Sequence, residues 1–308
     1  MIIKSIKCKT ITIHGMMRRS VHLLVLTCYL FFGCTGFFAS KMIDPIANSE
    51  THQMSYQDLT MYYYTVGDKT DPPLVFLHGI LVFTEAYSEL IEKLSERFYV
   101  IGIDLRGHGR STIGSQTYSH KLIAEDVIRV VDEIGLDKFH VVGHSAGGFA
   151  LLSIGKYFPN RMIKGVSIAS LYNHEGIDFQ EKGDDYLTPE GFRDNQNGRN
   201  NFTLKIFDSA YETLGEKEKF ENTKKIMMEH RTEMFPSYTS ADLMDIKTPI
   251  LVIVAENDRR IKPDHTIQMA NLLPNSRMEL VNGAAHFGII KRKKTLDVVV
   301  EHIFDFLK

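Results

Sequence analysis

A serine flanked by glycines stands directly after an apolar run near the middle of the chain. Residues 143–147 read Gly-His-Ser-Ala-Gly, behind the apolar run 139–142 and ahead of small residues that can enter a helix. A strand that turns sharply into a helix lifts the serine side chain into the open, and glycines on both sides permit the close backbone approach that the turn requires. The pattern predicts a nucleophile elbow in which Ser145 is the nucleophile.

A serine hydroxyl attacks a carbonyl well only when a base takes its proton, and that base needs a carboxylate partner. We expect the carboxylate and then a histidine downstream of the serine. Residues 249–255 form a short apolar run typical of a buried strand, and Asp258 follows its end. A second strand-like run, 278–281, leads through small residues to His286. The sequence therefore predicts Asp258 as the acid and His286 as the base.

Each of the three residues also has a purely structural interpretation. Ser145 could occupy an ordinary strand-to-helix turn, and His286 could be a loop histidine with a structural hydrogen bond. Glu256 and Asp264 are further carboxylates in the same stretch of sequence. Only Asp258 stands at the strand end with a proline a few residues on, so Asp258 is the preferred acid.

Two further motifs lie upstream of the elbow. Residues 78–80, His-Gly-Ile, follow the strand-like run 73–77, and residues 104–111 read Asp-Leu-Arg-Gly-His-Gly-Arg-Ser. From about residue 50 to the end, the order of all these motifs resembles that of α/β-hydrolase fold enzymes. The resemblance implies that fold, but the family includes esterases, lipases, lactonases, thioesterases, peptidases, carbon-carbon bond hydrolases and cofactor-free peroxidases, so the substrate stays open. Related haloalkane dehalogenases and epoxide hydrolases carry aspartate at the elbow, and Ser145 argues against both.

An oxyanion hole needs backbone N–H groups aimed at the oxygen that becomes negative in the tetrahedral intermediate. The amide of Ala146 is one candidate, because it directly follows the nucleophile at the start of a helix. The resemblance implies that the amide of Ile80 is the other. Since the backbone donates in both cases, we expect the side chain of Ile80 to shape the acyl-binding region instead.

Composition and charge narrow the function classes. The chain of 308 residues has 44% hydrophobic and 24% charged residues, which is ordinary for a globular protein, and a formal net charge of -2. No basic stripe, glycine-rich phosphate loop or metal-ligand spacing points to nucleic acid, a nucleotide cofactor or a metal, so we expect no cofactor. His78, His108 and His144 sit in separate loops beside glycines and are expected to shape those loops. Asp104 and Arg106 are likewise expected to stabilise a turn.

Strand-like and helix-like segments alternate along the chain. Expected strands cover 59–66, 74–77, 99–103, 138–142, 164–169, 249–255 and 278–281, and expected helices cover 85–95, 119–134 and 146–157. Such alternation predicts an α/β fold with a mostly parallel central sheet, helices on both faces, and ligands at the carboxyl ends of the strands. We expect residues 41–308 to form one α/β-hydrolase domain.

The alternation breaks down between about residues 171 and 246, just before the acid-bearing strand. This polar stretch contains two helix-prone segments, 203–214 and 216–230, which carry several apolar residues. We predict a helical lid here, because the resemblance implies a cap that covers the nucleophile and helps to select the substrate. The alternative is that the apolar residues only pack this segment onto the core.

Residues 1–40 differ in character from the rest of the chain. Arg18 and Arg19 precede an apolar run over 21–32, which is typical of an export signal and short for a membrane-spanning helix. The run leads to Cys34, and residues 30–34 resemble the bacterial lipobox, in which such a cysteine is lipidated. We predict an exported lipoprotein that contacts the cell-envelope membrane only through this segment. Ordinary secretion and an uncleaved anchor are the alternatives.

Together the motifs predict a serine hydrolase that cleaves a carboxylic ester or similar acyl bond of a small molecule through an acyl-enzyme intermediate. Lactone, thioester, amide and carbon-carbon bonds are alternative targets of the same residues. A small-molecule receptor with this fold is an alternative of another class. The expected partner is an acyl substrate rather than nucleic acid, and the oligomeric state stays open.

Overall fold

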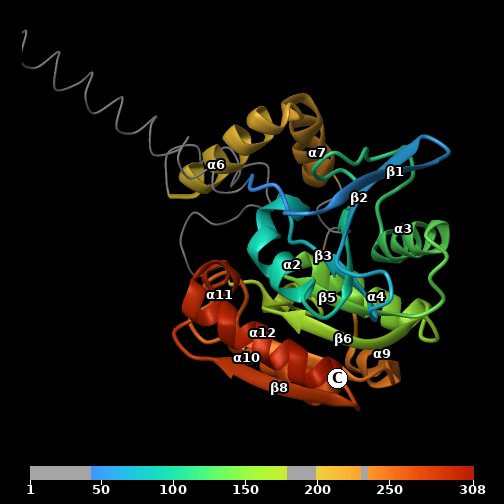
Figure 1. The fold of residues 1–308 in the computed structure, drawn as a ribbon. Helices are drawn as coiled ribbons and strands as arrows, with labels where there is room; N and C mark the ends of the chain where they lie inside the picture. Colours follow the sequence, from blue (N-terminus) through green and yellow to red (C-terminus); the bar gives the residue numbers. More distant parts are fainter. Residues whose placement is uncertain (1–42, 179–198, 230–234) are drawn as a thin grey trace, which may run out of the picture.

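One sheet organises the part of the chain that the structure, a computed structural model, describes: residues 43–178, 199–229 and 235–308. Within these residues the sheet has eight strands in the order β1-β2-β4-β3-β5-β6-β7-β8. Figure 1 shows helices packed around this sheet. The strands are β1 (Glu50–Tyr56), β2 (Leu59–Val66), β3 (Pro73–Leu77), β4 (Tyr99–Asp104), β5 (Phe139–His144), β6 (Met162–Ile168), β7 (Ile250–Ala255) and β8 (Ser276–Val281).

The sheet is parallel except at one edge. β1 pairs antiparallel with β2, and β2 pairs antiparallel with β4, whereas the strands from β4 through β3 to β8 are parallel to one another. The central strands β4, β5 and β7 are buried along their whole length, because helices cover both of their faces. The predicted α/β fold with a mostly parallel sheet is confirmed.

The helices lie on both faces of this sheet. Their bounds are η1 (Thr84–Tyr87), α2 (Ser88–Leu94), α3 (His120–Glu133), α4 (Ala146–Tyr157), η2 (His174–Gly176), α6 (Arg199–Leu214), α7 (Lys217–Glu229), α9 (Ser240–Asp245), α10 (Pro263–Leu272), α11 (Gly288–Lys291) and α12 (Lys293–Leu307). The predicted helix before β4 is a 3-10 turn, η1, followed by α2. The side chain of Ser119 caps α3 by accepting the Leu122 amide at 3.1 Å.

Alternate residues of each strand point to opposite faces, which builds two apolar layers. Leu74 and Phe76 of β3 pack in the layer that contains α2 and α12. Val75 and Leu77, the residues between and after them, pack in the layer that contains α3, α4 and α10. The loops at the carboxyl ends of the strands are therefore held between two helical layers.

Between β6 and β7 the chain leaves the sheet, and the described residues at the start and end of this stretch lie side by side. A β-bridge joins Asn173 to Ser237, and the Tyr238 amide donates to the Tyr172 carbonyl at 3.1 Å. Helices α6 and α7 lie between these two ends. Figure 1 shows them together on one side of the molecule, away from β8 and α12. The chain between the two ends is thus an excursion from the sheet, as an insertion would be.

Buried aromatic residues fasten α6 and α7 to the core. Phe207 and Tyr211 of α6 and Phe220 of α7 lie in the same apolar cluster as α2 and α12. Tyr211 stacks on Phe220 with ring centroids 4.2 Å apart, and its hydroxyl accepts the Gly109 amide at 2.9 Å. For these aromatic residues, packing onto the core is what the structure shows.

β1 is absent from the sequence prediction. It forms one edge of the sheet and pairs only with β2. Met54 is therefore its one buried side chain, and the other six residues are exposed or half-buried. A strand that buries so little carries no apolar run or clear alternation that would distinguish it in sequence.

The predicted export signal in residues 1–40 and the candidate lipidation site Cys34 lie outside the described residues. Export, lipidation and membrane attachment through this segment stay predictions. Among the residues that the structure describes, no helix is both long enough and apolar enough to cross a membrane.

Candidate active site

Ser145 occupies the sharp turn between β5 and α4. Its φ of 53° and ψ of -118° lie in a region that residues other than glycine rarely adopt, so the surrounding structure must hold them. A Cβ added to Gly143 would lie 2.3 Å from the Gly147 carbonyl oxygen, and one added to Gly147 would lie 2.0 Å from the Leu77 carbonyl oxygen. Only glycine fits at these two positions. The structure has the strand-turn-helix context that the sequence pattern predicts.

Three hydrogen bonds hold the backbone of Ser145 in this conformation. Its amide donates to the Ile168 carbonyl at the end of β6, at 2.9 Å. Its carbonyl accepts the Ser170 hydroxyl at 2.8 Å and the Gly148 amide at 2.9 Å. The strained turn is therefore tied to the neighbouring strand and to the first turn of α4.

His286 lies between Ser145 and Asp258. Its Nδ1 is 2.7 Å from Asp258 Oδ2, and its Nε2 is 3.0 Å from Ser145 Oγ. A carboxylate only accepts hydrogen bonds, so Nδ1 carries the ring proton and Nε2 accepts from the Ser145 hydroxyl. Each of the three residues is 6% exposed. The structure brings the three sequence-predicted residues into one buried hydrogen-bonded chain.

The carboxylate of Asp258 is oriented by the turn that follows β7. Its Oδ1 accepts the amides of Arg260 at 2.8 Å and Ile261 at 3.0 Å. Burial acts to raise the pKa of Asp258, but the charge and hydrogen bond of His286 and these two amides outweigh burial and hold the pKa below its ordinary value. Asp258 is therefore ionised and can stabilise a positive charge on His286.

The backbone amides of Ala146 and Ile80 belong to the two segments that adjoin Ser145. Ala146 is the first residue of α4, where an amide has no acceptor within the helix. Ile80 follows Gly79, and a Cβ added to Gly79 would lie 3.3 Å from Ser145 Cβ. Within the described ranges the structure gives neither amide an acceptor. Both N–H groups are available as donors close to Ser145.

The two other carboxylates of this stretch have structural positions. Glu256 accepts the Gly283 amide at 2.6 Å, which braces the loop that leads to His286. Asp264 lies in the first turn of α10, where a negative charge favours the helix terminus. Asp258 is the carboxylate that bonds to His286, as the sequence order favours.

All three of the histidines expected to shape loops bond to loop backbone, and two of them, His78 and His108, lie in the loops after β3 and β4. His78 donates from Nδ1 to the Gly79 carbonyl at 2.7 Å and accepts the Leu105 amide at Nε2 at 2.9 Å, which ties the loop after β3 to the loop after β4. His108 donates from Nδ1 to the Arg106 carbonyl at 3.0 Å. Burial lowers the pKa of His78 to about 4 and that of His108 to about 3, so both rings are neutral near pH 7. In the described part of the chain, no group of three His, Cys, Asp or Glu side chains could hold a metal ion.

The third histidine, His144, was expected in a loop but is the last residue of β5, and it contacts the site itself. Its Nε2 lies 3.0 Å from the carbonyl oxygen of His286, and its Nδ1 lies 2.9 Å from the hydroxyl of Tyr87. Sequence reasoning missed Tyr87 altogether. This residue lies 57 positions before His144, in η1, and no motif or spacing links the two.

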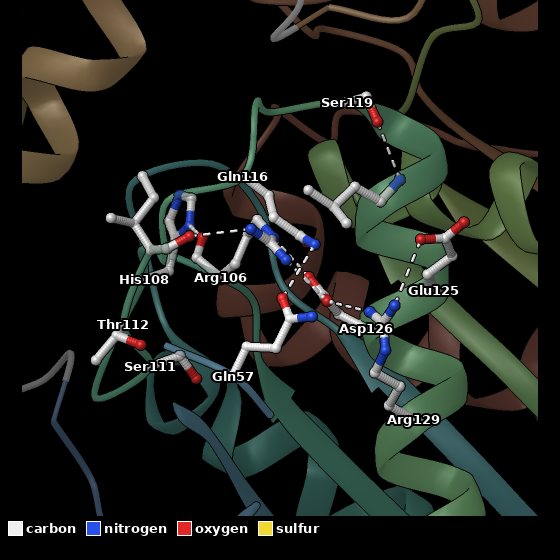
Figure 2. Close-up of polar contacts among 12 residues, drawn as sticks. Gln57, Arg106, His108, Ser111, Thr112, Gln116, Ser119, Glu125, Asp126 and Arg129 are labelled. Carbon is white, nitrogen blue, oxygen red and sulfur yellow. Dashed lines mark hydrogen bonds and ion pairs between the residues drawn. The ribbon is translucent and has the colours of Figure 1, made fainter. Parts of the chain in front are cut away.

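Figure 2 shows the polar contacts that surround Arg106 in the loop after β4. Its guanidinium donates to both carboxylate oxygens of Asp126 in α3, at 2.5 and 2.9 Å, and to the Ile113 carbonyl at 3.0 Å. Arg129 donates to the same carboxylate at 2.9 Å. Asp104 instead accepts two backbone amides, at 2.8 and 3.0 Å. Both Asp104 and Arg106 stabilise the loop, as predicted, and Arg106 also fastens it to α3.

Comparison with known proteins finds a matching family model and a related sequence. Residues 72–211 match the family model described as the alpha/beta hydrolase fold. A Haemophilus influenzae protein whose name describes it as an esterase/lipase is 25% identical over 266 residues, which are 84% of this chain and 89% of that protein. The similarity therefore extends well beyond the elbow motif.

Solved structures share the architecture over most of the chain. A membrane phospholipase A, described as a bacterial virulence factor, has a TM-score of 0.67 and 19% identity, and covers 96% of this chain and 98% of its own. Naproxen esterase from Bacillus subtilis has a TM-score of 0.67 and 18% identity, and covers 90% of this chain and 97% of its own. With the family match over residues 72–211 and the observed sheet, these likenesses show that the chain has the alpha/beta hydrolase fold.

Proposed function

We propose that the protein is a serine hydrolase that cleaves a carboxylic ester of a small molecule through an acyl-enzyme intermediate. The observation that carries this proposal is the hydrogen-bonded chain from Ser145 Oγ through His286 to Asp258, with lengths of 3.0 and 2.7 Å. A hydroxyl hydrogen-bonded to an imidazole, whose other nitrogen meets a buried carboxylate, is the arrangement that turns serine into a nucleophile. The name of the Haemophilus influenzae relative supports the same class of activity.

In the first half-reaction, Ser145 Oγ attacks the ester carbonyl carbon while His286 Nε2 takes the hydroxyl proton. The carbonyl oxygen becomes negative, and the amides of Ile80 and Ala146 donate hydrogen bonds to it. Asp258 stabilises the positive charge that forms on His286. When the bond to the leaving oxygen breaks, His286 gives its proton to the departing alcohol, and the acyl group stays on Ser145.

In the second half-reaction, a water molecule takes the place of the alcohol. His286 takes one proton from this water while the water oxygen attacks the acyl carbon. The same two amides stabilise the second oxyanion. Collapse of this intermediate releases the carboxylic acid, and the proton on His286 returns to Ser145.

Apolar side chains adjoin the reacting residues on two sides. A small cluster at Ala146 combines side chains from near the strand ends with two from the excursion between β6 and β7: Phe149, Leu171 and Ile261 with Ile177 and Phe235. On the side of His286, the ring of Phe287 lies against Phe207 of α6, with centroids 6.4 Å apart. These surroundings favour an apolar acyl group, and they support a role in substrate selection for the predicted lid, residues 171–246.

The test is hydrolysis of p-nitrophenyl esters of increasing acyl length by the full chain. The unmodified protein is expected to hydrolyse these esters, and Ser145→Ala is expected to lower kcat at least about 10³-fold, because the nucleophile is gone. Ser95→Ala is the matched control, since the partly buried Ser95 directly follows α2 and its hydroxyl donates to the Glu92 carbonyl of that helix, at 2.8 Å. The dependence on acyl length measures the size of the acyl-binding region.

Three outcomes would contradict parts of this proposal. Activity retained in Ser145→Ala would overturn the serine mechanism. A folded protein that cleaves lactones or thioesters but no simple ester would keep the mechanism and replace the substrate class. A folded protein that cleaves no acyl compound, and whose serine is not labelled by a fluorophosphonate, would favour a small-molecule receptor.

A further inference from the structure

A path of buried hydrogen bonds joins three loops of the site. The Gly79 amide donates to the Tyr87 hydroxyl at 3.0 Å, and this hydroxyl lies 2.9 Å from His144 Nδ1. His144 Nε2 lies 3.0 Å from the carbonyl oxygen of His286. Tyr87 is 2% exposed and His144 is 0% exposed. The path therefore runs from the loop after β3, through the last residue of β5, to the loop after β8.

One arrangement of protons satisfies every group on this path. The carbonyl of His286 only accepts, so His144 Nε2 carries the ring proton. Burial and the nearby charge of His286 lower the pKa of His144 to about 3, so the ring is neutral and its Nδ1 is an acceptor. The Tyr87 hydroxyl therefore donates to Nδ1, and its oxygen accepts the Gly79 amide. Each group has a fixed role as donor or acceptor.

We propose that Tyr87 is a positioning residue for the hydrolytic reaction, acting through His144 to set the separation between the Ile80 amide and His286. Gly79 directly precedes Ile80, so one end of the path fixes an oxyanion donor. The other end fixes the backbone of the base. The inference rests on the proposed function, because Tyr87 can position the reaction only if the Ile80 amide and His286 act on the same substrate.

The packing around the path leaves little room for these loops to shift. A Cβ added to Gly79 would lie 3.1 Å from the Tyr87 hydroxyl oxygen and 3.5 Å from His144 Nδ1. The rings of His144 and His286 have centroids 5.0 Å apart. The ring of Tyr87 packs on Phe76 at 4.9 Å. Tyr87→Phe therefore keeps the packed ring and removes only the hydroxyl that joins the two halves of the path.

The experiment compares the full chain with Tyr87→Phe on the best ester of the series. We expect kcat to fall about 10- to 100-fold, because a small displacement of the oxyanion donor from the base affects the transition state most. KM is expected to stay within about threefold, because the groups that bind the substrate are unchanged. Nitrogen-15 NMR is expected to show the neutral Nε2–H form of His144 in the unmodified chain and a mixture of the two neutral forms in Tyr87→Phe.

Tyr238→Phe is the matched control. Its hydroxyl is buried and lies 2.6 Å from Ser153 Oγ, in a pair separate from the path. We expect Tyr238→Phe to lose stability and to keep kcat and KM. An unchanged kcat in Tyr87→Phe, an equal loss in Tyr238→Phe, or a rise in KM alone would overturn the proposal.

The NMR measurement on the unmodified chain decides the matter even when Tyr87→Phe does not fold, since a proton on His144 Nδ1 would contradict the path. An unmodified chain that hydrolyses no acyl compound would instead overturn the proposed function, which the ester series detects separately.

Discussion

The loops around Ser145 and the helix pair α6–α7 are held in place by different means. Around Ser145, buried polar side chains bond to loop backbone: His78 and His144 to neighbouring loops, and Asp258 to the turn in which it lies. The helix pair contacts the core through stacked and buried rings, such as those of Tyr211 and Phe220. Its hydrogen bonds to the loop after β4 involve Tyr211, Lys219 and Thr223. Directional bonds fix atoms to within tenths of an ångström, whereas apolar contacts fix a surface and tolerate some sliding.

This difference separates two tasks within one chain. Proton transfer and oxyanion binding need fixed atoms, so these tasks fall to the loops that are bonded to one another. The accommodation of different acyl groups needs only an apolar surface of suitable shape, which a packed helix pair can supply. The predictions below test whether the two regions can be disturbed independently.

The largest effect is expected from Asp258→Asn. The asparagine amide would present a donor to His286 Nδ1 and favour the wrong tautomer of the ring, so kcat is expected to fall about 10⁴-fold with little change in KM. Steady-state hydrolysis of the best ester measures both quantities. Asp264→Asn, at the start of α10, is the control and is expected to keep kcat. A loss of less than tenfold in Asp258→Asn would mean that the bonded loops are not what sets the rate.

A large loss of stability, with little loss of rate, is expected from Arg106→Met. Burial raises the pKa of Asp126 in spite of the guanidinium groups of Arg106 and Arg129, so this carboxylate is strongly desolvated. Without Arg106, the buried Asp126 carboxylate loses the group that donates to both of its oxygens. The free energy of unfolding is therefore expected to fall by about 3–5 kcal/mol. Urea denaturation measures the change.

Arg277→Met is the control for that variant. Arg277 pairs with Asp305 at 2.7 Å on the surface, and a far smaller change is expected because solvent screens the pair. Equal losses in the two variants would show that burial of the Arg106 pair is unimportant. A loss of kcat in Arg106→Met as large as that in Asp258→Asn would show that stability and chemistry are not separable here.

The sequence was sufficient to predict the functional residues whose positions are marked by a local pattern in their own segment. Ser145 stands in a turn that demands glycines on both sides, and Asp258 and His286 follow strands that apolar runs reveal, so local patterns predicted all three positions. The parallel sheet followed from the same runs. These patterns predict which residues lie in the loops directly after the strands.

The contacts that bring distant segments together left no such pattern. Tyr87 meets His144, and Arg106 meets Asp126, only because the fold places η1 beside β5 and α3 beside the loop after β4. A tyrosine or aspartate in a helix has many possible partners, and one sequence gives no measure of which it will find. The places where α6 and α7 pack on the core were unpredictable for a related reason. Apolar residues in a helix show that it packs against something, but they do not identify the residues that it packs against.

A moderate dependence of stability on pH is expected from the buried neutral histidines. The pKa is lowered by burial to about 4 in His78, and to about 3 in His108 and His144. Each has a pKa of about 6.5 in the unfolded chain, so the unfolded state takes up protons first as pH falls. Each ring therefore removes about 1.4 kcal/mol of stability per pH unit between roughly pH 6 and the folded pKa. Urea denaturation at pH 7, 6 and 5 measures the slope.

His108→Asn sharpens this test, because the buried Nε2 of His108 has no hydrogen-bond partner among the described residues. The variant is expected to reduce the slope by the contribution of one histidine, about 1.4 kcal/mol per pH unit. His174→Gln, at an exposed position in η2, is the control substitution. A slope that stays the same in His108→Asn would mean that acid destabilises the protein by another route than these loops.

The smallest effect is expected from Lys219→Met on α7. The Lys219 ammonium donates to the Arg110 carbonyl at 2.7 Å, which links the helix pair to the loop after β4. The side chain is only partly buried, so its loss is expected to cost less than about 1 kcal/mol of stability. KM for the longest esters is expected to change about two- to threefold, while the rate at which a small fluorophosphonate labels Ser145 stays constant.

Lys217→Met on the same helix is the control for that variant. Among the described residues the Lys217 ammonium pairs with Glu212 at 3.4 Å, and its side chain is more exposed than that of Lys219. Labelling with a small probe depends on Ser145, His286 and the oxyanion amides and hardly on the acyl surface, so it reports on the bonded loops alone. Slower labelling in Lys219→Met than in Lys217→Met would show that α7 acts on the chemistry through the loop after β4. In that case the helix pair and the bonded loops would have to be treated as one mechanical unit, and substrate selection could not change without a change in rate.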